Sequence, residues 1–103
     1  MLIYKVFRLS EWAEFEALGE TPGSPADRAD GFVHFSTAEQ LPGTLDRHFA
    51  DHAGLMLLAV DADAAGPSLR WEPSRGGALF PHLYRPLART DVLWSRPVED
   101  ALP

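Results

Sequence analysis

The chain has 103 residues, of which 46% are hydrophobic, and a formal net charge of −6. This length can bury one core but not two, so we expect a single domain over residues 1–103. The absence of cysteine excludes disulfides, thiolate zinc sites and cysteine nucleophiles, and the scattered basic residues argue against DNA binding, which needs clustered positive charge.

The apolar runs are short. The longest, residues 55–60, has the length of one strand and falls far below the roughly 20 residues that cross a bilayer. Residues 1–7 lack the basic start and long apolar middle of a secretory signal. We therefore expect no membrane association and a cytoplasmic location.

The N-terminal quarter predicts a strand, a helix and a loop. Residues 3–7 are rich in β-branched and aromatic side chains, which favour a strand. Ser10 offers an N-cap for a short amphipathic helix that Gly19 ends. Residues 19–30 combine Gly, Pro, Ser and Asp without periodicity, which indicates a loop of unusual length.

The next segment predicts a strand that runs directly into a helix. Residues 31–36 have the composition of a strand, and Thr37 and Gln40 follow it with the spacing of a capping box. Pro42 cannot donate a backbone hydrogen bond, so we expect a break or a restart near it. We expect Gly54 to end this helix.

The C-terminal half predicts strands. Residues 55–60 are apolar throughout, as in a strand buried on both faces. Residues 69–72 and 92–95 predict two short strands, and residues 79–84 an extended segment broken by Pro81. The whole predicts an α+β domain with one bent, mixed sheet of five or six short strands and two main helices.

The first candidate site residues are His34, Ser36 and Thr37. Strand alternation places His34 and Ser36 on one face, so an imidazole projects beside a hydroxyl from a rigid element. His34 is a candidate acid or base, and the two hydroxyls are candidate ligand contacts. The alternatives are a histidine that is only hydrogen-bonded to backbone, and hydroxyls that only cap a helix.

Arg70 and Glu72 share the face of a strand opposite Trp71. An exposed ion pair contributes only about 0 to 1 kcal/mol to folding stability, so stability alone is a poor explanation for placing these two charges side by side. One interpretation is a solvated polar face. The other is anion recognition by Arg70, with Glu72 orienting it, contacting a ribose hydroxyl or acting as an acid or base.

Three further residues complete the candidate cluster. Arg75 stands beside two glycines, where backbone can approach a ligand closely, although the segment lacks the spacing of a P-loop or a dinucleotide-binding motif. In the extended segment, His82 and Tyr84 share a face. His82 is a candidate acid or base, and Arg75 and Tyr84 are candidate ligand contacts.

Two other kinds of chemistry receive little support. His48 and His52 have the spacing of a metal-binding pair, but no Glu follows His48 as in zinc proteases, and cations are favoured at a helix C-terminus anyway. We therefore predict no metal site. A hydrolase triad of Ser36, His34 and Asp30 or Asp61 lacks the Gly-x-Ser-x-Gly elbow.

Three motifs carry a family resemblance. Residues 30–40 (DGFVHFSTAEQ), 69–72 (LRWE) and 80–84 (FPHLY) resemble, in the same order, the small bacterial proteins called domain of unknown function 952. The resemblance spans nearly the whole chain. It implies the fold of the ADP-ribosyltransferase-like domains, with which this family is grouped.

That group includes NAD-dependent RNA 2′-phosphotransferases, in which a histidine-bearing strand is similar to residues 31–36. The resemblance therefore implies NAD as a cofactor and a transferase activity. The first strand departs from the transferase pattern, because Tyr4 and Lys5 stand where those enzymes use His or Arg to hold NAD.

Two functions from different classes remain open. The first is a binding or transferase domain for a nucleotide or another phosphorylated small molecule, with His34, Glu72 or His82 as acid or base. The second is a non-catalytic interaction or structural protein on the same scaffold.

Overall fold

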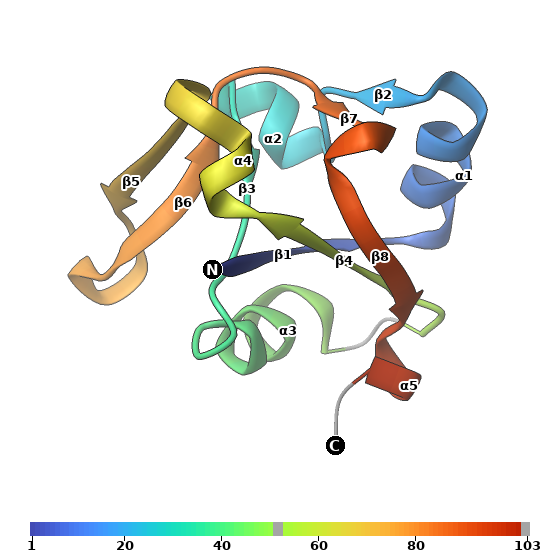
Figure 1. Cartoon of the computed structure of the whole chain (residues 1–103). Coiled ribbons are helices and arrows are strands. Elements are labelled where there is room, and N and C mark those ends of the chain that lie inside the picture. The colour runs from blue at the N-terminus through green and yellow to red at the C-terminus, as the bar shows by residue number, and fades with distance from the viewer. Residues whose placement is uncertain (51–52, 102–103) are drawn as a thin grey trace.

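The computed structural model describes residues 1–50 and 53–101 of the chain. A three-stranded antiparallel sheet crosses the middle of the molecule in the order β1 (Leu2–Phe7), β4 (Met56–Asp61) and β8 (Val92–Pro97) (Figure 1). Because β4 has a partner on each side, the predicted central strand is confirmed.

Apolar clusters pack against both faces of this central sheet. Leu58 of β4 belongs to one cluster, together with Phe7 and Phe15, and is fully buried. Leu57 belongs to the other cluster with Leu41, and only 2% of it is exposed. Neighbouring side chains of a strand point to opposite faces, so a strand between two clusters is apolar at successive positions.

A second antiparallel sheet has the order β3 (Val33–His34), β6 (Leu79–Leu83) and β5 (Leu69–Pro73). The predicted break at Pro81 was wrong, since β6 runs through this residue. The carbonyl of Pro81 accepts the N–H of Phe35 at 3.0 Å. The N–H and C=O of one residue in an antiparallel strand point to the same side. The N–H that Pro81 lacks would therefore point toward the end of β3, so its absence does not interrupt the hydrogen bonds between β6 and β5.

The predicted single bent, mixed sheet is instead divided into three small sheets, and every pairing among the described strands is antiparallel. The third sheet pairs β2 (Glu20–Thr21) with β7 (Leu87–Ala88). The first two sheets meet at one bridge, in which Tyr4 and Ser36 exchange backbone hydrogen bonds of 2.7 and 2.9 Å. The ladder stops there because the chain then turns into a helix.

The first helix, α1 (Leu9–Leu18), begins two residues earlier than predicted. Its N-cap is Arg8 and not Ser10. The Glu11 carboxylate accepts the backbone N–H of Arg8 at 2.8 Å, which supplies the reciprocal half of a capping box. Gly19 ends the helix in the left-handed conformation, as predicted.

The loop predicted over residues 19–30 was wrong, because this segment contains β2 and a capped helix, α2 (Pro25–Asp30). Ser24 Oγ accepts the Asp27 N–H at 3.2 Å, and the Asp27 carboxylate accepts the Ser24 N–H at 2.9 Å. With proline at the first helical position and Gly31 at the C-cap, the local signals for a helix are complete.

The capping box of Thr37 and Gln40 is confirmed, since each backbone N–H donates to the other's side chain, at 3.0 and 3.2 Å. The helix α3 (Leu41–Phe49) then begins with Pro42 in its first turn, where a missing N–H leaves no intrahelical bond unmade. This agrees with the predicted restart. The helix ends at Phe49 with Ala50 as its C-cap, so the prediction that Gly54 ends it was wrong.

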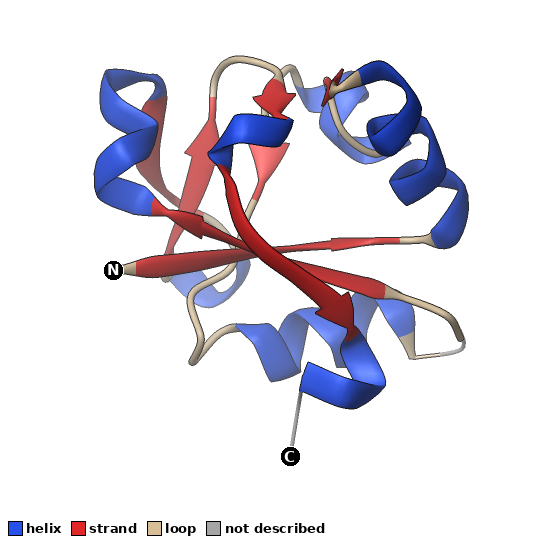
Figure 2. Cartoon of the chain, turned by 45° about the vertical axis from the view of Figure 1, so that its right-hand side comes forward, coloured by secondary structure: helices blue, strands red, loops and turns tan. Residues whose placement is uncertain are grey.

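The other elements are short. They are α4 (Ala62–Ala65), α5 (Val98–Ala101) and three 3-10 turns, η1 (Gly66–Ser68), η2 (Arg75–Gly77) and η3 (Arg89–Asp91). Helices lie on both sides of the central sheet (Figure 2), and the α+β class is confirmed. Within the described residues, no helix combines the length and the apolar character that a membrane span requires.

Candidate functional site

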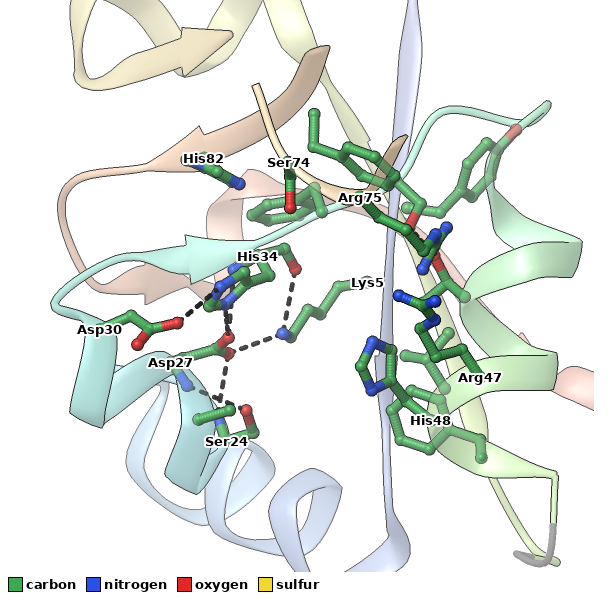
Figure 3. A pocket seen from close by; sticks show the side chains of 18 of the residues that line it. Lys5, Ser24, Asp27, Asp30, His34, Arg47, His48, Ser74, Arg75 and His82 are labelled. Atoms are coloured by element: carbon green, nitrogen blue, oxygen red, sulfur yellow. Dashed lines mark hydrogen bonds and ion pairs between the residues drawn. The ribbon is translucent and has the colours of Figure 1, made fainter. Parts of the chain in front are cut away.

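A pocket of about 420 Å³ lies where β1, α2, α3 and the second sheet meet (Figure 3). We call it the central pocket. Its volume falls in the lower part of the range of about 300 to 1,000 Å³ that is typical of small-molecule sites. Its polar lining comprises Tyr4, Lys5, Arg8, Ser24, Asp27, Asp30, His34, Ser36, Thr44, Arg47, His48, Ser74, Arg75 and His82.

Asp27 organises one wall of the pocket, although only 1% of its side chain is exposed. Its Oδ1 accepts the backbone N–H of His34 at 3.1 Å and contacts His34 Nδ1 at 2.5 Å. Its Oδ2 lies 2.6 Å from Lys5 Nζ and accepts the N–H of Ser24. Both carboxylate oxygens are therefore saturated, which makes Asp27 an organising residue and leaves it no free lone pair for a ligand.

Burial and the contacts with neighbouring groups shift the pKa values of Asp27 and Lys5 in opposite directions. Burial raises the pKa of Asp27, but the hydrogen bond from His34 and the charge of Lys5 outweigh it and lower that pKa to about 2. Burial lowers the pKa of Lys5, and the Asp27 carboxylate opposes this effect. An ionised Asp27 accepts hydrogen bonds only, so His34 Nδ1 must carry a proton.

His34 is oriented through both of its ring nitrogens. While Nδ1 contacts Asp27, Nε2 lies 3.0 Å from Asp30 Oδ2, and the His34 side chain remains 35% exposed toward the pocket. A carboxylate that fixes the tautomer and orientation of an imidazole is a common support for an acid–base group. The ring of His82 stands edge-on to His34, with centroids 5.3 Å apart.

The opposite wall carries positive charge. Arg47 and His48 come from α3, and Arg75 comes from η2 (Figure 3). Among the described residues, neither guanidinium has a carboxylate within ion-pair distance. Partial burial and the charges of Arg75 and Arg47 lower the pKa of His48. The two guanidiniums disfavour a positive charge on His48, and a bound anion would relieve this repulsion.

Arg75 is held in place without an ion pair to any described residue. Its guanidinium lies over the Phe80 ring at 4.9 Å and donates to Thr44 Oγ1 at 3.4 Å. Thr44 Oγ1 in turn forms a hydrogen bond of 2.7 Å with Ser36 Oγ. Stacking on an aromatic face leaves the edge of the guanidinium available for planar, bidentate recognition.

A second polar cluster lies beside the pocket on the same face of the second sheet. Glu72 Oε1 contacts His82 Nδ1 at 2.8 Å and accepts the Tyr84 hydroxyl hydrogen bond at 2.6 Å. The hydrogen bonds from Tyr84 and His82 lower the pKa of Glu72, and the hydrogen bond to Glu72 raises the pKa of Tyr84. The Arg70 guanidinium stacks over the Tyr84 ring at 4.7 Å.

The structure therefore divides the predicted site residues into two groups. His34, Ser36, Arg75 and His82 line the central pocket. Thr37, Arg70, Glu72 and Tyr84 do not line it: Thr37 caps the turn before α3, and the other three form the neighbouring cluster. Arg70 pairs with His82 in register, but its strand lies at the sheet edge and carries it past the rim of the pocket.

Sequence reasoning missed Lys5, Asp27 and Arg47. Strand alternation places Lys5 on the face of Ile3 and Phe7, and a lysine on a buried face requires a counter-charge, which was a usable signal. Asp27 was hidden in a segment taken as a loop. Arg47 belongs to the exposed face of a helix and carried no signal in the sequence.

The structure offers no support for a metal centre in the part of the chain it describes. No group of three or more His, Asp or Glu side chains there is arranged to hold a metal ion. His52, one member of the pair considered for metal binding, lies outside the described residues. His48 is instead part of the cationic wall.

Fold and site together define a small α+β domain with a charge-lined pocket at the junction of two antiparallel sheets. Residues 6–95 match the family described as protein of unknown function (DUF952). This chain therefore belongs to the DUF952 family, and the predicted family resemblance is confirmed.

Solved structures agree with this assignment. The crystal structure of protein CC0527 from Caulobacter crescentus matches with 47% identity and a TM-score of 0.91, over 94% of this chain and 85% of that chain. The solution NMR structure of the same protein matches with 48% identity and a TM-score of 0.83, over 93% and 83% of the two chains. A search of curated proteins finds no match.

Proposed function

We propose that this domain binds a nucleotide-like, phosphate-bearing small molecule in the central pocket. The observation that supports this most directly is the cationic wall, where Arg47, Arg75 and His48 gather without a carboxylate partner among the described residues. Holding like charges together costs free energy in the ligand-free protein. A phosphate group removes that cost and accepts bidentate hydrogen bonds from a guanidinium.

In this proposal Arg75 recognises the anion, and not Arg70, the residue favoured by the sequence. Both guanidiniums stack on an aromatic ring, but Arg75 lines the pocket and Arg70 does not. A ligand held by Arg75 would also lie in the same pocket as His34, whereas a ligand on Arg70 would lie outside it.

The ADP-ribosyltransferase-like grouping suggests NAD as the ligand and a group transfer as the reaction. The residues present fit the pyrophosphate of NAD, because two guanidiniums on one wall can share its two negative charges. When bound, NAD would supply an activated ribosyl group. His34, oriented by Asp27, is the group in the pocket best arranged to hold or move a proton.

Isothermal titration with inorganic phosphate, ADP-ribose and NAD tests the proposal, using Arg75→Lys and Arg70→Lys as a matched pair. Each variant keeps its charge and loses its planar fork. We expect Arg75→Lys to weaken binding about tenfold, the effect of one good charged hydrogen bond, and Arg70→Lys to bind like the wild type. Thermal melts of both variants control for changes in the fold.

Two results would contradict the proposal. If the wild type binds none of the three anions, the alternative of a non-catalytic interaction protein takes precedence. If Arg70→Lys weakens binding and Arg75→Lys does not, the ligand site is the neighbouring cluster and not the central pocket.

A further inference from the structure

The two walls of the central pocket have different hydrogen-bonding chemistry (Figure 3). Arg47 and Arg75 carry positive charge on one side, where His48 lies beside them. On the other side, Asp30 presents a carboxylate whose Oδ2 contacts His34 Nε2 at 3.0 Å, and whose side chain is 53% exposed. One wall therefore suits an anion, and the other suits a group that donates hydrogen bonds to a carboxylate.

The second wall also offers donors. Lys5 Nζ lies between Asp27 Oδ2, at 2.6 Å, and the backbone carbonyl of His34, at 3.0 Å. An ammonium has three N–H donors, so one of them is left for the pocket that Lys5 lines. Ser24 accepts a hydrogen bond from Asp27 N, and its own hydroxyl proton is free to be donated.

The acceptor Asp30 and the donors Lys5 and Ser24 together favour a ligand hydroxyl over a ligand amine. A ligand hydroxyl can donate to Asp30 and at the same time accept from Lys5 or Ser24. A ligand ammonium would approach the buried Lys5 ammonium, whose ion-pair partner Asp27 is shared with His34. Like charges repel most strongly where water is excluded, as around the buried Lys5 ammonium, so the wall favours a neutral polyol.

We infer that the ligand of the central pocket is a phosphorylated polyol of the sugar-phosphate class, with its phosphate on Arg47 and Arg75 and a hydroxyl on Asp30. The inference rests on the proposed function, because it assumes that the cationic wall binds the phosphate. It adds Asp30 as the residue that determines specificity for the hydroxyl-bearing part.

The test compares ligands that share a phosphate monoester and differ in their hydroxyls. Ribose 5-phosphate and glycerol 3-phosphate carry hydroxyls, and methyl phosphate carries none. NMR titration of the full-length protein measures their affinities. We expect at least one of the two polyol phosphates to bind about tenfold more tightly than methyl phosphate, with shifts at Asp30 and His34 that methyl phosphate does not cause.

The variant Asp30→Ala removes the carboxylate, and Glu39→Ala makes the same change of charge at an exposed position outside the pocket. We expect Asp30→Ala to abolish the preference of the polyol phosphate over methyl phosphate and to leave methyl phosphate binding intact. Glu39→Ala should retain the preference. Because both positions are exposed, both variants should fold.

The failures of the two proposals are distinguishable. If all three phosphates bind with equal affinity and Arg75→Lys weakens each of them, the inference about the polyol is overturned and the proposed function stands. If the preference survives in Asp30→Ala, the assignment of Asp30 is overturned. If no phosphate binds at all, both proposals fail together.

Discussion

Lys5 Nζ and Asp27 Oδ2 lie 2.6 Å apart, with side chains that are only 7% and 1% exposed. The pair joins the central sheet to α2, and Asp27 also positions His34. A buried ion pair contributes little net stability because of the cost of desolvation, so its value lies in the geometry that it imposes on the pocket.

Removing one partner of this pair should be costly. Asp27→Asn keeps the shape of the side chain and leaves Lys5 buried without a counter-charge. We expect it to lower the free energy of unfolding by about 3 to 5 kcal/mol. The control is Glu14→Gln, which breaks the ion pair between Glu14 and Arg28. Their side chains are 45% and 49% exposed, so this change should cost at most about 1 kcal/mol. Urea denaturation measures both, and equal losses would contradict the buried role.

Asp27 should also govern the loss of stability in acid. Its pKa is about 2 in the folded protein, against 3.8 for an unperturbed side chain. Between these values the unfolded chain binds the proton and the folded protein does not, so stability falls as the pH is lowered through this window. We expect Asp27 to account for about 2 kcal/mol of that loss.

Urea denaturation of the wild type and Asp27→Asn at pH 4.5, 3.5 and 2.5 measures this contribution. The wild type should lose stability more steeply than the variant. Parallel pH profiles for the two proteins would show that Asp27 is not responsible.

Gly23 should be needed because of its close approach to Asp27. Its φ is 101°, and a Cβ atom there would lie 2.1 Å from Asp27 Oδ2, whereas at Gly19, with φ of 78°, a Cβ would meet nothing within 4 Å. Gly19→Ala should therefore cost about 1 kcal/mol, from the left-handed backbone alone. Gly23→Ala should cost about 1 to 3 kcal/mol more, from steric displacement of Asp27. Similar melting temperatures for the two variants would refute the steric argument.

The protonation of His48 should report on the cationic wall. Burial and the charges of Arg75 and Arg47 lower its pKa, so removing one charge should raise it. We expect Arg75→Gln to raise the pKa of His48 in the ligand-free protein, and saturating phosphate to raise it in the wild type. NMR titration of the ring measures both, with Arg70→Gln as the variant that should change nothing. A pKa that phosphate leaves unchanged would argue against an anion on this wall.

Much of the secondary structure follows from short-range signals in the sequence. The apolar run of residues 55–60 predicted the central strand, because a strand between two cores needs apolar side chains on both faces. The capping box of Thr37 and Gln40 was likewise readable, since its partners are three residues apart. The same signal at Ser24 and Asp27 was present and was overlooked among the turn-forming residues around it.

Tertiary structure decided which of the predicted residues line the central pocket. His34 and His82 could be placed on strand faces from alternation alone, and both line the pocket. Alternation gives the face of a strand but not its place in the sheet. Alternation therefore gives Arg70 and His82 the same standing, but β5 is the edge strand, and Arg70 does not line the pocket.

The contacts that define the pocket join segments far apart in the chain. Lys5, Asp27 and Arg75 come from β1, α2 and η2, and no local pattern relates them. Local sequence determined where strands and helices form, because propensity, periodicity and capping act over a few residues. Only the packing of the sheets and helices decided which charges meet, because burial sets which of them must find a partner and which are left for a ligand.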